Sequence, residues 1–312
     1  ISFDSPRWYH RGFWLPLLAI LLGLVLQNLY KAESHPDITP LATLYLGTMF
    51  VACMVCHGEV YRLRPGASRL TGFYLSLSAG GAAGGLFVAL AAPFVFPDYF
   101  ELHLALFLTA ALVLIVLRQD PTRPFREGQA RWAWAVPFVA LAALGYGLAD
   151  VATTSLRGSL STTRGFYGVL KVNDNDAGND GLHHLTLQHG ATIHGLQYVD
   201  AEKRTDPSSY YTSTSGIGRL LRAHKPGGGR RVGAIGLGCG TLAAWGRPGD
   251  TFRFYEINDD VARLATSTFT YLKDSKAKTE LVMGDARLSM EREANQQYDV
   301  IVLDAFSSDA IP

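Results

Sequence analysis

The sequence has few cysteines, almost no net charge and no long apolar run in its second half. Cys53, Cys56 and Cys239 are its three cysteines in 312 residues, which is too few for a disulfide framework. The 28 Lys and Arg residues nearly balance the 27 Asp and Glu residues, so charge gives no reason to expect a nucleic-acid partner. The long apolar runs all precede residue 150. We therefore expect a membrane domain over residues 1–155 and a soluble part after it.

Five apolar runs in the first half are long enough to span a bilayer, which takes about 17 to 25 residues. They cover residues 13–30, 41–60, 70–96, 99–117 and 132–149. Trp8, Trp14 and Trp132 lie at the edges of these runs, as interfacial aromatic residues do. In the third run, the glycine pairs 80/84 and 81/85 have the spacing that lets a neighbouring helix approach closely. The sequence predicts a multi-pass membrane domain surrounded by lipid.

Arginines in the short loops predict the orientation of these spans. One side of the membrane carries nine of them: Arg7, Arg11, Arg62, Arg64, Arg69, Arg118, Arg123, Arg126 and Arg131. The other side offers Lys31. The arginine-rich side is expected to be cytoplasmic. Five spans then place the soluble part on the extracytoplasmic face. If the soluble part is an enzyme that uses a cytoplasmic metabolite, it must lie on the cytoplasmic face instead.

The second run contains the pattern C-x-x-C-H, which attaches haem in c-type cytochromes. Cys53, Cys56 and His57 form it, close to the arginine-rich loop. Haem attachment takes place on exposed chain on the other side of the membrane, so we expect no haem here. His57 and Glu59 are costly to place in a bilayer and are candidate functional residues, with interhelical hydrogen bonding as the alternative.

The second half has the pattern of an α/β domain with a small antiparallel sheet at its N-terminal end. Residues 156–215 contain short alternating segments such as "LHHLTLQHG" and "ATIHGLQYVD", which predict about three antiparallel strands. From residue 216 to 312, buried strands alternate with helices. This order predicts a parallel, doubly wound, Rossmann-like sheet.

Three features of the predicted parallel sheet indicate a nucleoside ligand. The turn "GLGCG" supplies Gly236, Gly238 and Gly240 between a strand and a helix start, where backbone can approach a ligand closely. Glu256 ends the next strand, 20 residues after Gly236, where a carboxylate accepts ribose hydroxyls. Asp285 ends the third strand, beside the expected adenine edge. The turn lacks the G-x-G-x-x-G spacing, so an adenosyl-sulfonium compound fits better than NAD.

Residues 164–312 resemble the spermidine synthase (polyamine aminopropyltransferase) family, within the S-adenosylmethionine-dependent methyltransferase folds. The resemblance is carried by "VGAIGLGCGTLAAWG", "YEIN", "MGDAR" and "YDVIVLDAFSSDAIP", in the family's order. The first half, with "CHGE" and "LTGFYLSLSAGGAAGG", resembles the multi-span segment of membrane-fused bacterial members. The resemblance implies a location in the bacterial cytoplasmic membrane.

The resemblance also implies a reaction and its residues. The reaction is transfer of an aminopropyl group from decarboxylated S-adenosylmethionine to a diamine such as putrescine. Asp309 matches the family's catalytic aspartate, and Asp304 is expected in the same pocket. The donor would be held at its ribose by Glu256 and at its adenine by Asp285 and Ala286, with Gly236, Gly238 and Gly240 beneath it. Positions near the acceptor are matched by Gln197 and Tyr211.

Several departures from the family pattern leave alternatives open. Cys239 stands where the family has an aspartate that holds the donor's amine. Tyr211 is followed by Thr212 rather than by an acidic residue for the diamine. A sheet of this class needs about three more strands than the sequence up to Pro312 supplies. The alternatives are a methyltransferase that uses ordinary S-adenosylmethionine and a non-catalytic accessory subunit of a membrane complex.

Overall fold

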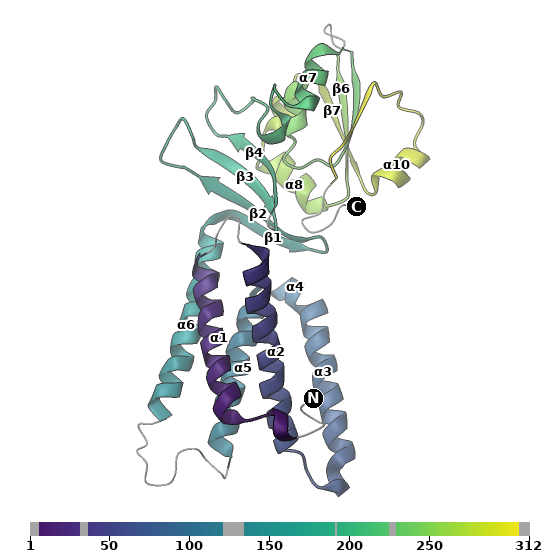
Figure 1. Cartoon of the computed structure of the whole chain (residues 1–312). Helices are drawn as coiled ribbons and strands as arrows, with labels where there is room; N and C mark the ends of the chain where they lie inside the picture. Colours follow the sequence, from purple (N-terminus) through teal and green to yellow (C-terminus); the bar gives the residue numbers. More distant parts are fainter. Residues whose placement is uncertain (1–5, 32–36, 121–133, 191, 225–228, 306–312) are drawn as a thin grey trace. The chain divides into compact units, whose positions relative to one another are not determined.

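The computed structural model describes residues 6–31, 37–120, 134–190, 192–224 and 229–305. The chain forms two compact units, Ile1–Leu156 and Arg157–Pro312, called unit 1 and unit 2 below (Figure 1). Unit 1 is helical, and unit 2 contains both sheets.

Unit 1 contains five helical stretches that are long and apolar enough to cross a membrane. They are α1 (Arg11–Lys31), α2 (Ile38–Arg62), a composite third stretch, α5 (Phe100–Gln119) and α6 (Ala135–Arg157). The third stretch joins α3 (Leu70–Leu86), the π-helical segment η3 (Phe87–Ala91) and α4 (Ala92–Val95). Short 3₁₀ segments, η1 (Pro6–Trp8) and η2 (Ala67–Arg69), precede α1 and α3. Each predicted run is therefore helical where the structure describes it, apart from Phe96 and Tyr99 at the ends of their runs.

The core of unit 1 forms mainly between α1 and α2, which pack side by side (Figure 1). Leu22 and Val25 on α1 meet Val51 and Val55 on α2. By contrast, no residue of α3 is buried. A Cβ added at any of its four central glycines would meet nothing within 4 Å among the described residues. The close helix approach predicted at these glycines is therefore not made within the described part of the chain.

An ion cluster joins the ends of three segments of unit 1. Glu59 on α2 is 5% exposed and accepts a hydrogen bond of 2.6 Å from the Tyr9 hydroxyl. The Arg11 guanidinium donates to both oxygens of Glu59, at 2.7 and 2.6 Å, and contacts Asp120 at the end of α5 at 2.5 Å. Gly58 leaves the space that the Tyr9 ring fills, since an added Cβ would lie 2.2 Å from that ring. Glu59 therefore makes the interhelical contacts that were the alternative to a functional role.

Unit 2 begins with a four-stranded antiparallel sheet in the order β1-β2-β3-β4. Its strands are β1 (Ser159–Gly165), β2 (Gly168–Asn175), β3 (His184–His189) and β4 (Thr192–Tyr198). The sequence predicted about three strands and missed β1, because "SLSTTRG" is rich in serine and threonine and has little apolar alternation. This sheet belongs to the C-terminal half of the chain and precedes the parallel sheet in the sequence.

The second sheet of unit 2 is parallel throughout and has the order β7-β6-β5-β8. Its strands are β5 (Arg231–Ile235), β6 (Thr251–Glu256), β7 (Lys278–Met283) and β8 (Val300–Leu303). The helices around it are α7 (Gly216–Ala223), α8 (Asp259–Ser267), α9 (Tyr271–Asp274) and α10 (Ala286–Arg292). In chain order the strands read 3-2-1-4, which is consistent with a methyltransferase-like, doubly wound fold.

The segment after the glycine turn differs from its prediction. Residues 241–245 form a short 3₁₀ helix, η6 (Thr241–Trp245), rather than the start of an α-helix. Gly246 is extended and Pro248 follows, so the helix cannot continue. A second 3₁₀ segment, η5 (Ser209–Tyr211), lies in the tyrosine-bearing loop after β4.

Candidate functional site

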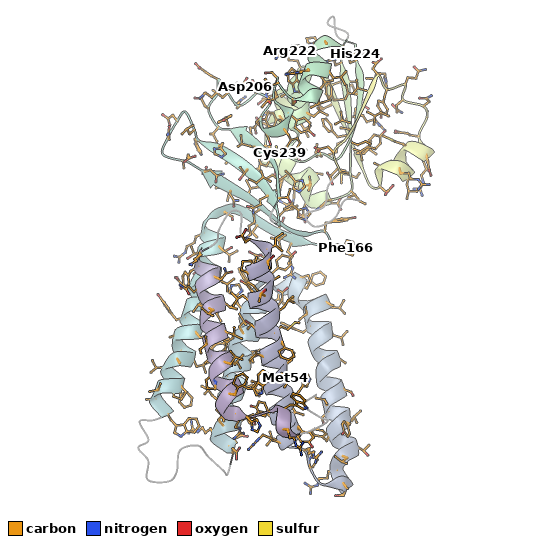
Figure 2. All side chains as sticks on the ribbon, in the orientation of Figure 1. Met54, Phe166, Asp206, Arg222, His224 and Cys239 are labelled. Atoms are coloured by element: carbon orange, nitrogen blue, oxygen red, sulfur yellow. The ribbon has the colours of Figure 1, made fainter. Side chains whose placement is uncertain are left out.

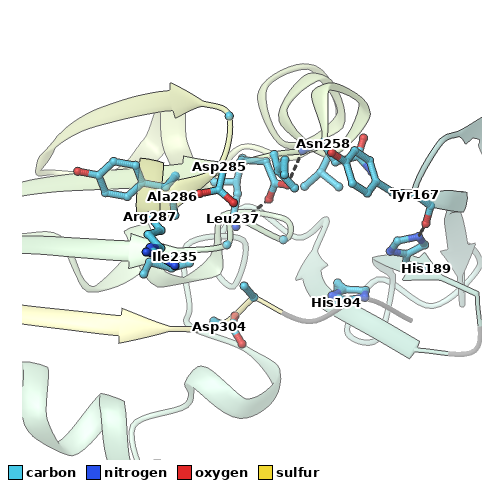
Figure 3. Close-up of a pocket in the computed structure, with 18 of the residues that line it drawn as sticks. Tyr167, His189, His194, Ile235, Leu237, Asn258, Asp285, Ala286, Arg287 and Asp304 are labelled. Atoms are coloured by element: carbon cyan, nitrogen blue, oxygen red, sulfur yellow. Dashed lines mark hydrogen bonds between the residues drawn. The ribbon is translucent and has the colours of Figure 1, made fainter. Parts of the chain in front are cut away.

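A cavity of about 700 Å³ opens in unit 2 at the carboxyl ends of the parallel strands (Figure 3). Residues that directly follow or end each strand contribute to its wall: Gly236 and Leu237 after β5, Glu256 on β6, Asp285 and Ala286 after β7, and Asp304 after β8. Doubly wound sheets bind ligands at this edge, and the volume is within the range of about 300 to 1,000 Å³ of small-molecule sites.

Two positions of the glycine turn have no room for a side chain, because neighbouring backbone packs closely against them. Gly236 and Gly238 have φ of 98° and 56°, which favours glycine. A Cβ on Gly236 would lie 2.2 Å from the Asp304 carbonyl oxygen, and one on Gly238 would lie 2.7 Å from the His194 carbonyl oxygen. Gly240 does not line the cavity; a Cβ there would contact Leu272 at 3.2 Å. Of the three predicted glycines, the structure brings Gly236 and Gly238 to the site.

Glu256 lies at the floor of the cavity and is 8% exposed. Its Oε2 accepts the Leu237 backbone N–H at 3.1 Å, and its Oε1 accepts the Asn258 backbone N–H at 2.8 Å (Figure 3). These two bonds fix the carboxylate and leave further lone pairs for hydroxyl donors. Burial raises the pKa of Glu256, while the backbone hydrogen bonds oppose that shift. The geometry suits a carboxylate that accepts hydrogen bonds from a diol.

Asp285 and Ala286 also line the cavity. Asp285 is the N-cap of α10, and its Oδ1 accepts the Leu288 backbone N–H at 2.8 Å. β7 ends at Met283, and the cap starts α10 two residues later, on the same cavity wall as Glu256. Contact of Asp285 and Ala286 with an adenine edge stays a prediction.

Asp304 forms the wall of the cavity after β8 and is tied to two tyrosines. Its Oδ2 accepts hydrogen bonds from the Tyr211 hydroxyl and, at 3.4 Å, from the Tyr210 hydroxyl. Burial raises the pKa of Asp304, and these two bonds oppose the rise. Tyr211 is itself buried and contacts the site through Asp304 rather than lining the cavity. Asp309, the predicted catalytic aspartate, lies outside the described residues.

Gln197 is not brought to the cavity. It is 4% exposed, and its amide donates to the Arg204 carbonyl and the Thr270 hydroxyl, both at 2.9 Å. Its Oε1 accepts the Thr270 backbone N–H at 2.9 Å. These bonds join β4 to the start of α9, so the position observed for Gln197 is a tertiary contact inside unit 2.

Cys239 also faces away from the cavity and lies in the interior of unit 2 (Figure 2). Its sulfur fills the space left by Gly195, where an added Cβ would lie 2.1 Å from Sγ. Burial raises the pKa of the Cys239 thiol to about 11, so the group is neutral at pH 7. The glycine turn therefore presents no charged side chain of its own to a ligand.

Three cavity residues with polar groups, from the antiparallel sheet and its first turn, were not predicted as site residues. Tyr167 precedes β2, His189 ends β3 and His194 lies on β4. The available signal was the segment "QHGATIHG", in which two histidines flank a short hairpin turn. Its position opposite the glycine turn depends on long-range packing, which the sequence pattern does not specify.

Within the described residues, no group of three or more His, Cys, Asp and Glu side chains is placed to hold a metal ion. Cys53 and His57, from the haem-like pattern, are exposed positions on α2.

No protein-family model and no curated protein matches the chain. A solved structure of a probable spermidine synthase from Corynebacterium glutamicum ATCC 13032 matches it with a TM-score of 0.39 and 17% sequence identity. The match covers 49% of this chain and 54% of that one, so the chain spans about half the length of the matched protein.

Proposed function

We propose that unit 2 binds an adenosyl-sulfonium donor in the cavity and transfers its aminopropyl group to an amine, with a diamine as the expected acceptor. Unit 1 would hold the enzyme in a bacterial cytoplasmic membrane. The observation that carries this proposal is the position of Glu256. It ends the second strand of a doubly wound sheet and faces an open cavity beside two glycines that tolerate no side chain.

The proposed chemistry follows from the charges of the reactants. The positive sulfur of decarboxylated S-adenosylmethionine makes the adjacent carbon electrophilic. An alkylammonium has a pKa of about 10.4 and must lose a proton before its nitrogen attacks that carbon. The new C–N bond forms as the C–S bond breaks, and its electron pair stays on sulfur as a neutral thioether. Asp304 and Asp309 remain the proposed acidic residues near the acceptor.

A methyltransferase that uses ordinary S-adenosylmethionine is the second candidate. The position of Cys239 favours it, because this neutral, buried side chain replaces the carboxylate that the resemblance predicts for the donor's amine. Both candidates share the adenosyl site and differ in the group on sulfur.

Substitution of Glu256 tests the adenosyl site. The full-length protein in detergent is titrated calorimetrically with decarboxylated and with ordinary S-adenosylmethionine. We expect the wild type to bind one of them. Glu256→Gln should bind it about 10- to 100-fold more weakly, because the charged carboxylate that accepts hydrogen bonds from the ribose hydroxyls is replaced by a neutral amide. Glu202→Gln, at an exposed position in the loop after β4, is the control and keeps wild-type affinity.

The preferred donor decides between the two candidate reactions. Tighter binding of the decarboxylated compound supports aminopropyl transfer, and tighter binding of ordinary S-adenosylmethionine supports methyl transfer. Binding of neither compound by the wild type contradicts both and favours the non-catalytic accessory subunit.

A further inference from the structure

Two histidines form part of the cavity wall that the antiparallel sheet contributes. The ring centroids of His189 and His194 are 5.5 Å apart, with the rings tilted by 45°. In Figure 3 both imidazoles lie across the cavity from Ile235 and Arg287. The sheet therefore brings two titratable groups to the side of the cavity away from the predicted adenine site.

A β-bulge determines where His194 faces. Leu187 pairs with Gly195, and the next residue of β3, Gln188, pairs with Ile193. His194 is thus the extra residue of the bulged strand, and both His194 and Gly195 oppose Leu187. This shift turns His194 to the face of the sheet that carries Leu187 and His189, which both line the cavity. Bulges of this kind re-aim a side chain and are frequent next to active sites.

The bulge also docks β4 against the glycine turn. Gly195 has no Cβ and makes room for the Cys239 sulfur, while the His194 carbonyl oxygen packs against Gly238. These contacts therefore fix the backbone of His194 next to the glycine turn, which would hold the donor.

His189 is held in one orientation by the backbone. Its Nε2 lies 2.5 Å from the Tyr167 carbonyl oxygen. A carbonyl only accepts, so Nε2 of His189 carries a proton and donates it to Tyr167. His189 is thus a fixed neighbour of His194 and is committed to a structural hydrogen bond at this nitrogen.

His194 differs from His189 because its buried Nε2 has no hydrogen-bond partner among the described residues. A buried polar atom without a partner is unusual. His103 and His224 share this feature, but only His194 of the three belongs to the cavity wall, where a ligand can complete it. Burial, and secondarily the proximity of His189, lower the pKa of His194 below 6.5, so the ring is neutral at pH 7 and can accept a proton. The other titratable groups on the cavity wall are Tyr167, His189, Tyr255, Glu256, Asp285, Arg287, Glu291 and Asp304.

We infer that His194 is a catalytic residue that accepts the proton of the acceptor nucleophile, an inference that rests on the proposed group transfer. The acceptor nitrogen gives its N–H proton to Nε2 of His194 and its lone pair to the carbon next to the sulfonium. The C–S bond breaks, sulfur keeps the electron pair, and the imidazolium later releases its proton to water. This role is separate from that of the predicted carboxylates. It places the acceptor amine on the side of the cavity that carries His189 and His194.

The test compares His194→Gln with His224→Gln in the full-length protein. His224 follows α7, does not line the cavity and also has a buried Nε2 without a partner among the described residues, so it is a matched control. Calorimetry with 5′-methylthioadenosine measures the adenosyl site. Single-turnover rates with decarboxylated S-adenosylmethionine and 1,4-diaminobutane are then measured between pH 5 and pH 10.

We expect both variants to bind 5′-methylthioadenosine like the wild type. His194→Gln lowers the single-turnover rate at pH 7 by about 10²- to 10⁴-fold, the usual contribution of a general base. It also removes the fall in rate that the wild type shows below the pKa of His194. In His194→Gly, added imidazole restores part of the rate in proportion to its free-base concentration, which a structural role for His194 does not explain.

Two results overturn the inference in distinguishable ways. If the wild type binds and reacts but His194→Gln keeps its rate and pH profile within about threefold, the proton has another acceptor and the proposed function stands. If the wild type binds neither the thioether nor the donor, or shows no turnover, the proposed function fails and the role of His194 fails with it.

Discussion

At the residue scale, the cavity depends on where side chains are missing as much as on where they are present. Gly195, Gly236 and Gly238 each occupy a position where an added Cβ would overlap a neighbouring atom at less than 3 Å. They let the antiparallel sheet and the backbone at Asp304 pack closely against the glycine turn. The acidic residue at the end of β6 then faces an opening rather than a packed core.

Gly195→Ala tests this close packing. Its methyl group would overlap the Cys239 sulfur, and overpacking of this kind lowers the free energy of unfolding by about 1 to 3 kcal/mol. Denaturant unfolding of the full-length protein, followed by tryptophan fluorescence to which Trp245 contributes from unit 2, measures the effect. Adding Cys239→Ala removes the overlapping sulfur and should recover part of the loss.

A matched glycine keeps that result interpretable. Gly216→Ala, at the start of α7, meets nothing within 4 Å and should leave stability nearly unchanged. Equal destabilisation by both alanine variants would contradict the packing account.

The sequence predicts some site residues better than others, for a physical reason. Glu256 was placed correctly at the end of a strand, since a buried strand that ends in an acid is visible in the residue pattern. Asp285 was predicted to end the third strand, but β7 ends at Met283 and Asp285 is the N-cap of α10. His194 was missed because a bulge changes which residues share a face, and no local pattern reports it. Gln197 was predicted to lie near the acceptor, but its amide donates hydrogen bonds to the Arg204 carbonyl and the Thr270 hydroxyl instead. Its role at the acceptor stays a prediction.

At the scale of elements, a buried ion pair joins the starts of β5 and β6 to their neighbours. The side chains of Arg230 and Asp250 are fully buried. Arg230 donates from its backbone and from Nε to Asp250, at 2.8 and 2.9 Å, and from its guanidinium to the Leu221 and Trp245 carbonyls. One side chain thus connects both strands with α7 and η6.

Asp250→Asn leaves the buried guanidinium without its counter-charge. We expect it to lower the free energy of unfolding by about 3 to 5 kcal/mol, as measured by denaturant unfolding. Asp206→Asn, at an exposed loop position, is the control. A loss below 1 kcal/mol would show that the pair does not stabilise the joined elements.

The same pair predicts a pH dependence. Burial alone would raise the pKa of Asp250, but hydrogen bonds from Arg230 bring it below its ordinary value of 3.8. A lowered carboxyl pKa contributes stability above pH 3.8 and loses it as the pH falls through the folded-state pKa. The wild type should therefore lose more stability than Asp250→Asn when the pH is lowered below about 4.

Element predictions succeeded where apolar periodicity was strong. The five apolar runs and the alternation of parallel strands with helices follow directly from such patterns. β1 was missed because it pairs with β2 through a tight turn at residues 166 and 167 while carrying few apolar side chains. η6 was expected as an α-helix start, but the following glycine and proline stop it after one short segment.

At the scale of the whole molecule, the sequence of unit 1 and the proposed chemistry of unit 2 predict opposite sides of the membrane for unit 2. The arginine count predicts an extracytoplasmic unit 2, whereas the proposed donor is a cytoplasmic metabolite. Reporter fusions after residue 160 measure the side directly. The proposed function requires the cytoplasmic reporter to be active, which would show that the arginine count misleads for this chain. An active extracytoplasmic reporter would contradict catalysis and favour the accessory-subunit alternative.

The proposed function requires an adenosine moiety to lie across the carboxyl edge of the parallel sheet. An experimental density map of the full-length protein with bound 5′-methylthioadenosine tests it most directly. We expect the ribose hydroxyls to donate hydrogen bonds to Glu256 and the purine to lie beside Asp285 and Ala286. The thioether sulfur should face Asp304 and His194. Density for the nucleoside elsewhere, with the cavity closed by side chains or Glu256 turned out of it, would contradict the account.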